Sequence, residues 1–223
     1  MTLYFSHIRL ARTPAAQALS PLLTPADPAA RRSAQHNLLW SIFSDGPERR
    51  RDFLWREEND SSYLALSARP PAESELFEPH NVRVFAPALT PGDRLDFQLR
   101  CNATRTKRNG QRVDVVMDAL HVVPKAQRAE KRMELANSAG QAWLARQGAK
   151  AGFSVISAQA VDYSAQVLTG HRGPRKGQPQ FGILDLSGRI EVTDPTAFLG
   201  HLPLGFGRAK AFGCGLMLIR RAA

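Results

Sequence analysis

The sequence has few cysteines and no long apolar run, and both absences narrow what the protein can be. Among its 223 residues only Cys101 and Cys214 carry thiols. Neither has cysteine or histidine neighbours at the spacing of a zinc site, which excludes a disulfide-rich scaffold and makes structural zinc unexpected. No stretch has the length of a transmembrane helix, and residues 1–10 lack the pattern of a signal peptide. We therefore expect a reduced, cytoplasmic protein that has no membrane contact and needs no metal or other cofactor.

Several familiar catalytic signatures are also missing. A P-loop needs Lys followed by Ser or Thr after its last glycine, whereas Lys210 precedes Ala211 and Gly213 is still to come. The dinucleotide fingerprint needs a glycine where Lys210 stands and a helix behind it. Asp114 and Asp118 would face each other on a helix, but their segment reads as a strand, which disfavours a two-metal nuclease. There is no G-x-S-x-G elbow and no reactive cysteine context.

Positive charge is abundant and unevenly placed. The formal net charge is +10, and all of the excess lies in residues 101–223, which hold 18 Lys and Arg against 8 Asp and Glu. Residues 1–100 hold 12 of each, and the run Arg49-Arg50-Arg51 there, flanked by Glu48 and Asp52, reads as solvated surface. The basic residues are mostly arginines, which suit bidentate phosphate contacts. This lopsided charge favours nucleic acid as the partner, since no basic amphipathic helix points to a membrane.

Residue patterning predicts a mixed α+β chain. In the first half we expect a strand at 2–10, an irregular connection at 12–30, a helix at 31–44, strands at 52–58 and 62–68, a Pro-containing connection at 70–91 and a strand at 94–101. This order is that of a ferredoxin-like fold. The second half repeats it less clearly, with a hairpin turn at Asn109-Gly110, a strand at 113–117, a helix at 126–148, strands at 153–168 and 180–192, a short helix at 195–202 and a last strand from 216.

A glycine-rich segment near the C-terminus is the most specific motif. It reads GFGRAKAFGCGL from 205 to 216, with Gly205, Gly207, Gly213 and Gly215 placed around Arg208 and Lys210. Glycines let a backbone meet a polar ligand through its N–H groups. Residue for residue, the segment resembles the C-terminal glycine-rich loop of the CasE (Cse3) family, in the Cas6 group of CRISPR-associated proteins. The resemblance implies two tandem ferredoxin-like domains of the RRM or RAMP type, which we place at 1–92 and 93–223.

One histidine gains a role from this resemblance. An imidazole can both take and give a proton near neutral pH, but His36 considered alone reads as a surface or capping residue. CasE proteins carry a catalytic histidine on the first helix in the context H-x-x-L-W-x-x-F, which His36, Leu39, Trp40 and Phe43 match. The resemblance therefore implies a catalytic His36. Several relatives have a tyrosine three positions earlier, where this chain has Ser33, which puts a tyrosine partner in doubt.

Two basic segments of the second half are candidate RNA contacts. The hairpin carries Arg105, Lys107, Arg108 and Arg112, and a loop at 169–177 carries Arg172, Arg175 and Lys176. Taken alone, the loop reads as a solvated hairpin tip, and flexible surface is the lesser alternative for the hairpin. In a CasE-like frame, the hairpin would grip the phosphates or the major groove of a distorted stem. A loop cation, with Lys176 as the candidate, would stabilise charge on the phosphate at the cut, and Arg208 and Lys210 would add RNA contacts.

The resemblance also implies the activity. It indicates a metal-independent endoribonuclease that cuts CRISPR precursor RNA at the 3′ base of the repeat hairpin, by attack of the 2′-hydroxyl, and leaves a 2′,3′-cyclic phosphate. It further implies that the enzyme keeps its product as a subunit of the type I-E Cascade complex, beside the backbone subunit. The residues leave open whether His36 is the general base or the general acid. They also leave two alternatives, a non-catalytic cap on an RNA hairpin and a structural RNA-binding protein.

Overall fold

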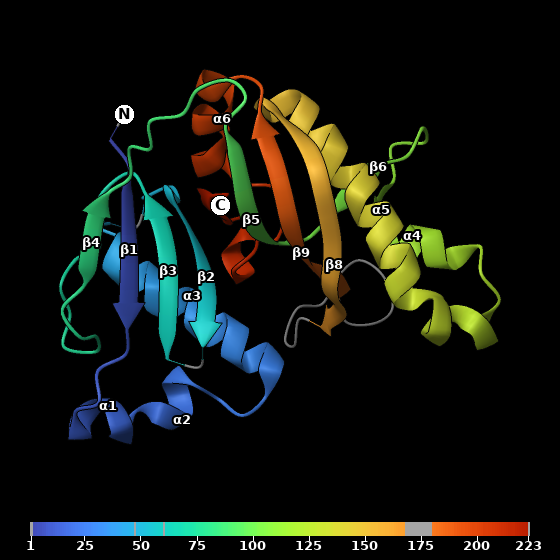
Figure 1. The fold of residues 1–223 in the computed structure, drawn as a ribbon. Coiled ribbons are helices and arrows are strands. Elements are labelled where there is room, and N and C mark those ends of the chain that lie inside the picture. The colour runs from blue at the N-terminus through green and yellow to red at the C-terminus, as the bar shows by residue number, and fades with distance from the viewer. Residues whose placement is uncertain (1, 47, 60, 168–179, 223) are drawn as a thin grey trace.

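Two four-stranded antiparallel sheets stand side by side, each with helices against one face (Figure 1). The structure is a computed structural model that describes residues 2–46, 48–59, 61–167 and 180–222. Within these ranges no helix is both long and apolar enough to cross a membrane.

The first sheet is built from residues 4–84. Its strands are β1 (Tyr4–Arg9), β2 (Phe53–Asn59), β3 (Ser62–Ser67) and β4 (Asn81–Val84), in the order β2-β3-β1-β4. Helix α3 (Pro28–Phe43) packs its buried stripe, Leu39, Ile42 and Phe43, against this sheet. The helix begins at Asp27, whose carboxylate accepts a hydrogen bond of 2.7 Å from the Ala30 N–H. The sheet and α3 together form the first unit.

Two parts of the first half differ from the sequence prediction. The connection expected to be irregular contains two short helices, α1 (Pro14–Ala18) and α2 (Ser20–Leu23). Its prolines indicated a break, but Pro14 and Pro21 lie in the first turn of these helices, where a missing N–H costs nothing. Strand β4 lies inside the connection expected at 70–91. Its residues are mostly exposed, so no apolar alternation marks it.

The second sheet is built from residues 94–221. Its strands are β5 (Arg94–Cys101), β8 (Phe153–Val167), β9 (Gln180–Val192) and β10 (Met217–Arg221), in the order β10-β5-β9-β8. Helices α5 (Arg128–Ala151) and α6 (Pro195–His201) cover one face and share its buried core, as with Leu144 of α5 and Leu99 of β5. The remaining elements are β6 (Thr104–Thr106), β7 (Arg112–Asp114), α4 (Val115–His121), η1 (Lys125–Gln127), η2 (Leu202–Leu204) and η3 (Lys210–Phe212).

The strand predicted at 113–117 is wrong. Strand β7 ends at Asp114 and helix α4 begins at the next residue, Val115. The carboxylate of Asp114 accepts hydrogen bonds from the N–H groups of Val116 (2.9 Å) and Met117 (3.0 Å), which is an N-cap. The run of β-branched valines favoured a strand, and this single cap outweighs that propensity.

Both sheets repeat one topology. Numbered in chain order within each sheet, the strands are arranged 4-1-3-2 with antiparallel neighbours, which is the ferredoxin-like arrangement. The prediction of an α+β fold with two tandem ferredoxin-like domains is therefore confirmed. The strand at 94–101 belongs to the second unit alone, because β4 is the fourth strand of the first. Residues 68–80 contain no helix, so the first unit lacks the second helix of the motif.

The two units share a hydrophobic core. Leu54 and Leu66 of the first sheet lie in the same buried cluster as Leu95, Leu216 and Met217 of the second. The boundary between residues 92 and 93 stays a prediction, because these buried contacts run across it.

Candidate functional site

The glycine-rich segment at 205–216 lies between the two units. Its glycines all have positive φ, 71° at Gly205, 76° at Gly207, 74° at Gly213 and 100° at Gly215. A Cβ at Gly213 would lie 3.1 Å from the ring of Trp55 on β2. A Cβ at Gly207 would lie 2.6 Å from the backbone oxygen of Asn102, just after β5. Close packing against both units therefore requires glycine here, in addition to the backbone conformation. We call residues 205–216 the glycine wedge.

Backbone N–H groups of the glycine wedge are used inside the protein. Phe206 donates to the carbonyl of Gly215 (3.0 Å), and Gly215 donates to the carbonyl of Arg100 (2.7 Å). Arg208 donates to the carbonyl of Asn102 (3.1 Å). These three N–H groups are not available to a ligand, so at these positions the wedge can offer side chains only.

His36 lies on α3 against the glycine wedge. Its ring centroid is 6.0 Å from that of Trp40, one turn later on the helix, and 6.4 Å from that of Phe212 in the wedge. A hydrogen bond joins the imidazole to the backbone of Ala211. Its Nδ1 atom is buried without a hydrogen-bond partner in the described part of the chain. The fold thus brings together the two motifs that carried the family resemblance, although they lie near opposite ends of the sequence.

The surroundings of His36 keep its imidazole neutral. Burial lowers its pKa below the usual 6.5, and the positive charge of Arg51 lowers it further. The hydrogen bond to Ala211 acts in the opposite direction with a smaller effect. At pH 7 the ring is therefore predominantly unprotonated and ready to accept a proton.

No tyrosine replaces the one that several CasE proteins have before their histidine. Ser33 occupies that position and is exposed. Tyr63 is fully buried, with its ring 5.9 Å from that of Trp55. The hydroxyl of Tyr163 donates to Asp114 (3.0 Å), and Tyr4 lies on β1 between β3 and β4. The position on α3 where several CasE proteins have a tyrosine is therefore occupied by Ser33 in this chain.

Cations gather around His36 and the glycine wedge. Lys210 directly precedes the residue that bonds His36, and burial lowers its pKa, as do the charges of Arg51 and Arg208. The predicted contacts Arg208 and Lys210 therefore belong to one cluster with His36. Arg51, which the sequence placed on solvated surface, is a member too, because its charge acts on both His36 and Lys210. Arg51 was missed in the sequence because the neighbouring carboxylate of Asp52 seemed to neutralise its charge.

The predicted cations of the β6–β7 hairpin are of two kinds. Arg105 forms an ion pair with Asp118 on α4, and Nζ of Lys107 lies 2.6 Å from the same carboxylate. Arg108 and Arg112 are exposed and have no ion pair among the described residues. Helix α4 thus neutralises part of the hairpin and leaves two arginines free for an external anion.

A hollow of about 560 Å³ opens beside this hairpin. Its basic lining residues are Lys107, Arg112, Arg128 and Arg132. Phe181 of β9 also lines it, and its ring centroid is 5.4 Å from that of Phe212 in the glycine wedge. This aromatic pair connects the basic hollow with the site at His36.

The basic loop between β8 and β9 cannot be placed in the same way. Arg172, Arg175 and Lys176 lie in residues 168–179, outside the described residues. Their roles stay predictions.

A charged joint holds the two units together near the glycine wedge. Arg100 on β5 donates to Asp185 on β9 through Nε (3.0 Å) and Nη2 (2.9 Å). Arg56 on β2 of the first unit lies 4.0 Å from the same carboxylate. The Asp185 side chain is only 15% exposed, so water screens these contacts weakly. Asp185 therefore links cations of both units.

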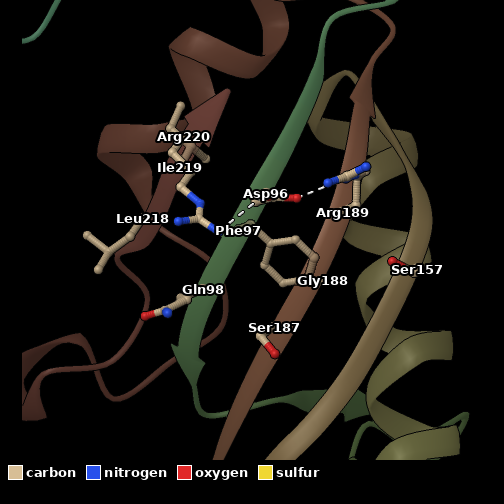
Figure 2. A pocket seen from close by; sticks show the side chains of 10 residues that line it. All are labelled: Asp96, Phe97, Gln98, Ser157, Ser187, Gly188, Arg189, Leu218, Ile219 and Arg220. Carbon is tan, nitrogen blue, oxygen red and sulfur yellow. Dashed lines mark hydrogen bonds and ion pairs between the residues drawn. The ribbon is translucent and has the colours of Figure 1, made fainter. Parts of the chain in front are cut away.

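A second hollow, of about 580 Å³, lies on the second sheet. Figure 2 shows Asp96 bonded there to Arg189 (2.8 Å) and within 3.4 Å of Arg220. None of the predicted site residues lines it, and its cations are already paired with a carboxylate. The region around His36 is therefore the better candidate site.

The cysteines and acidic residues offer no competing chemistry. Cys101 and Cys214 are buried and unpaired, and burial raises the pKa of both thiols, to about 12 for Cys214. Such thiols are unreactive. In the ranges that the structure describes, no group of three or more His, Cys, Asp or Glu side chains could hold a metal ion.

Known proteins resemble this chain over nearly its whole length. A family model described as CRISPR associated protein matches residues 3–221. CRISPR-associated endoribonuclease Cse3 from Thermus thermophilus is 29% identical over 222 residues, which cover 89% of this chain and 96% of that protein. CRISPR system Cascade subunit CasE from Escherichia coli is 26% identical over 188 residues, with 82% and 88% covered.

A solved structure of Thermus thermophilus Cse3, bound to an RNA representing a pre-cleavage complex, has a similar fold. The TM-score is 0.67 at 23% identity, over 99% of this chain and 100% of that one. The predicted resemblance to the CasE (Cse3) family is thereby confirmed, and the chain belongs to the CRISPR-associated protein family.

Proposed function

We propose that the protein is an endoribonuclease that cleaves CRISPR precursor RNA at the 3′ base of the repeat hairpin, without a metal ion and with His36 as general base. The observation that carries the proposal is the position of His36, a neutral imidazole held against the glycine wedge within a cluster of cations. The Thermus thermophilus relative named an endoribonuclease supports it.

The reaction needs only groups of the kind that this site offers. The 2′-hydroxyl before the cut attacks the phosphorus in line, and its proton passes to His36. The bond between phosphorus and the 5′-oxygen breaks, and this oxygen takes up a proton from water. The products are a 2′,3′-cyclic phosphate and a 5′-hydroxyl, so no oxidant, reductant or second substrate is consumed. Fixed cations stabilise the extra negative charge of the pentacoordinate phosphate.

The RNA stem is proposed to lie along the basic second unit. The contacts that we assign to it are Arg105, Lys107, Arg108, Arg112, Arg172, Arg175, Lys176, Arg208 and Lys210. Two observations support this path. Arg108 and Arg112 have no ion pair among the described residues, and a hollow with basic lining lies beside them. Phosphates bind where cations lack internal partners. A stem would be selected mostly by its shape and backbone. Lys176 is kept as a second cation for the cut phosphate.

The protein is also proposed to retain its product and to serve in Cascade, in contact with the backbone subunit. The Escherichia coli relative is named a Cascade subunit, which supports this assignment. Such an enzyme works close to single turnover. We place it in the cytoplasm, where unpaired cysteines such as Cys101 and Cys214 stay reduced.

The test is cleavage of the host's own repeat RNA in EDTA by wild type and His36→Ala, with binding measured in parallel. We expect wild type to cut and His36→Ala to bind equally well without cutting. Cleavage by His36→Ala at the wild-type rate would remove His36 from the reaction. Cleavage by wild type only after a divalent metal is added would refute the metal-free mechanism.

The second candidate is a cap that binds an RNA hairpin without cutting it. The observation that favours it is Ser33, which leaves His36 without the tyrosine of several relatives. If wild type and His36→Ala both bind the hairpin tightly and neither cuts, the protein is a non-catalytic RNA-binding cap.

A further inference from the structure

Arg51 lies two residues before β2, the strand of the first sheet that packs against α3 through Phe53. The β2–β3 pairing continues past the end of β2, because the N–H of Ala68 donates to the carbonyl of Asp52 (3.1 Å), so the backbone there is still extended. Side chains alternate along extended backbone, so Arg51 shares a face with Phe53. The ring of Phe53 is 5.4 Å from that of Trp40 on α3, which in turn is 6.0 Å from His36. Arg51 therefore leads into the part of the sheet that packs against Trp40, which lies one turn from His36 on α3.

Two carboxylates near Arg51 in sequence, Asp52 and Asp45, are paired with other arginines, and no ion pair joins Glu48 to Arg51 in the described part of the chain. Oδ2 of Asp52 accepts from Nε of Arg69 (2.9 Å), and Asp45 forms ion pairs with Arg69 and Arg49. Among the described residues, Arg51 has no hydrogen bond and no ion pair. Its guanidinium thus keeps its donors for an external group.

Arg51 also stands between the two reactive parts of the site. Its charge lowers the pKa of His36 on α3 and that of Lys210 in the glycine wedge. A cation that acts on both residues, without an ion pair of its own, creates a place of strong positive potential. The ligand that fits such a place beside a neutral imidazole is a phosphate group.

We propose that Arg51 binds the non-bridging oxygens of the phosphate at which the RNA is cut and stabilises the negative charge that they gain during attack by the 2′-hydroxyl. The inference rests on the proposed function and adds a residue to it. Arg51 takes and gives no proton, and it makes or breaks no covalent bond. Its planar guanidinium can donate two parallel hydrogen bonds to one phosphate, and these bonds strengthen as charge builds up.

The experiment compares Arg51→Ala with Arg50→Ala under single-turnover conditions with saturating protein. Arg50 is the matched control, because it is the neighbouring arginine, it is exposed like Arg51, and alternation places it on the other side of the chain. We expect Arg51→Ala to cut about 10²-fold more slowly, while its Kd for the hairpin changes by less than about fivefold. Arg50→Ala should keep the wild-type rate, and Arg51→Lys should recover part of the loss because it restores the charge but not the two-pronged contact.

A second measurement reads the environment of His36 without RNA. NMR titration of the His36 ring should give a higher pKa in Arg51→Ala than in wild type, because the neighbouring positive charge is gone. Arg50→Ala should leave this pKa unchanged. Circular dichroism and thermal melting of each variant separate loss of rate from loss of folding.

The outcomes distinguish this inference from the proposed function. If His36→Ala is inactive and Arg51→Ala cuts at the wild-type rate, the role of Arg51 is wrong and the ribonuclease assignment stands. If Arg51→Ala loses binding as much as cleavage, Arg51 is an ordinary RNA contact and the proposal is overturned. If His36→Ala itself cuts normally, the proposed function fails first.

Discussion

The ring of Phe212 lies 6.4 Å from the ring of His36. The glycine wedge therefore forms one wall of the candidate site, and α3, which carries His36, forms another. The backbone of Ala211, next to Phe212, bonds the same imidazole. The wedge therefore controls the burial and the hydrogen bonding of His36, and through them its proton affinity.

The first prediction concerns pH. Because burial and Arg51 lower the pKa of His36, the free enzyme loses this proton below pH 6.5. A base must be unprotonated to act, so the second-order constant for cleavage should rise with pH and level off, with its midpoint below 6.5. The measurement uses protein in excess over RNA and below its Kd. Thermal melts across the same pH range exclude unfolding as the cause, and a midpoint above 6.5 would contradict the assignment.

The second prediction concerns the glycine wedge. Gly207→Ala places a Cβ 2.6 Å from the carbonyl oxygen of Asn102 at a φ of 76°, so the wedge must shift. We expect a loss of about 1–3 kcal/mol in the free energy of unfolding and a clear fall in cleavage. Gly200→Ala in α6 is the control, because nothing lies within 4 Å of its Cβ position. Alanine is favoured over glycine inside a helix, so this variant should be as stable as wild type or about 0.5–1 kcal/mol more stable.

The third prediction concerns the joint between the units. Asp185→Asn removes the charge that Arg100 and Arg56 share, and it leaves two partly buried guanidinium groups without compensation. Breaking such a pair costs on the order of 3 kcal/mol in the free energy of unfolding. Asp96→Asn removes a carboxylate whose partners Arg189 and Arg220 are 37% and 82% exposed, so its denaturation midpoint should move less than that of Asp185→Asn. Equal effects of the two substitutions in urea denaturation would mean that the joint contributes little.

The fourth prediction concerns the hairpin. Arg108 and Arg112 have no internal ion pair, so each is free to neutralise one phosphate. Replacing either with alanine should reduce the slope of log K against log salt for hairpin binding by about 1. Arg105 is paired with Asp118, so Arg105→Ala should change that slope less. Fluorescence anisotropy at several salt concentrations measures all three, and identical slopes would place the RNA elsewhere.

Local patterns in the sequence were enough to predict most of the elements that build both units. The apolar stripe of α3, the glycine turn of the hairpin and the strands β5 and β9 each carry their own signal, and all were predicted. Strand β4 was missed because pairing with β1 determines it, and pairing partners are not visible in a short window. Helix α4 was mistaken for a strand because its valines favour a strand, whereas the N-cap at Asp114 starts a helix.

The candidate site was predictable in its parts and not in its assembly. His36 and the glycine wedge were identified because a family resemblance marks both. Their contact depends on how the two units pack, which no local pattern encodes. Arg51 was misread for a related reason, since the sequence suggested Asp52 as its partner and the fold gives Asp52 to Arg69.

The position of the glycine wedge also sets the time at which the site forms during synthesis. The wedge is held to β5 through the bond from Gly215 to Arg100, and strand β10, which follows it, closes the sheet against β5. Proteins emerge from the ribosome in order, and α3 with His36 appears long before residues 205–221. The site around His36 therefore lacks this wall until residues 205–216 have been made. Because the wedge supplies one wall of the site, we expect cleavage only after residues 205–216 have been synthesised and have packed against α3.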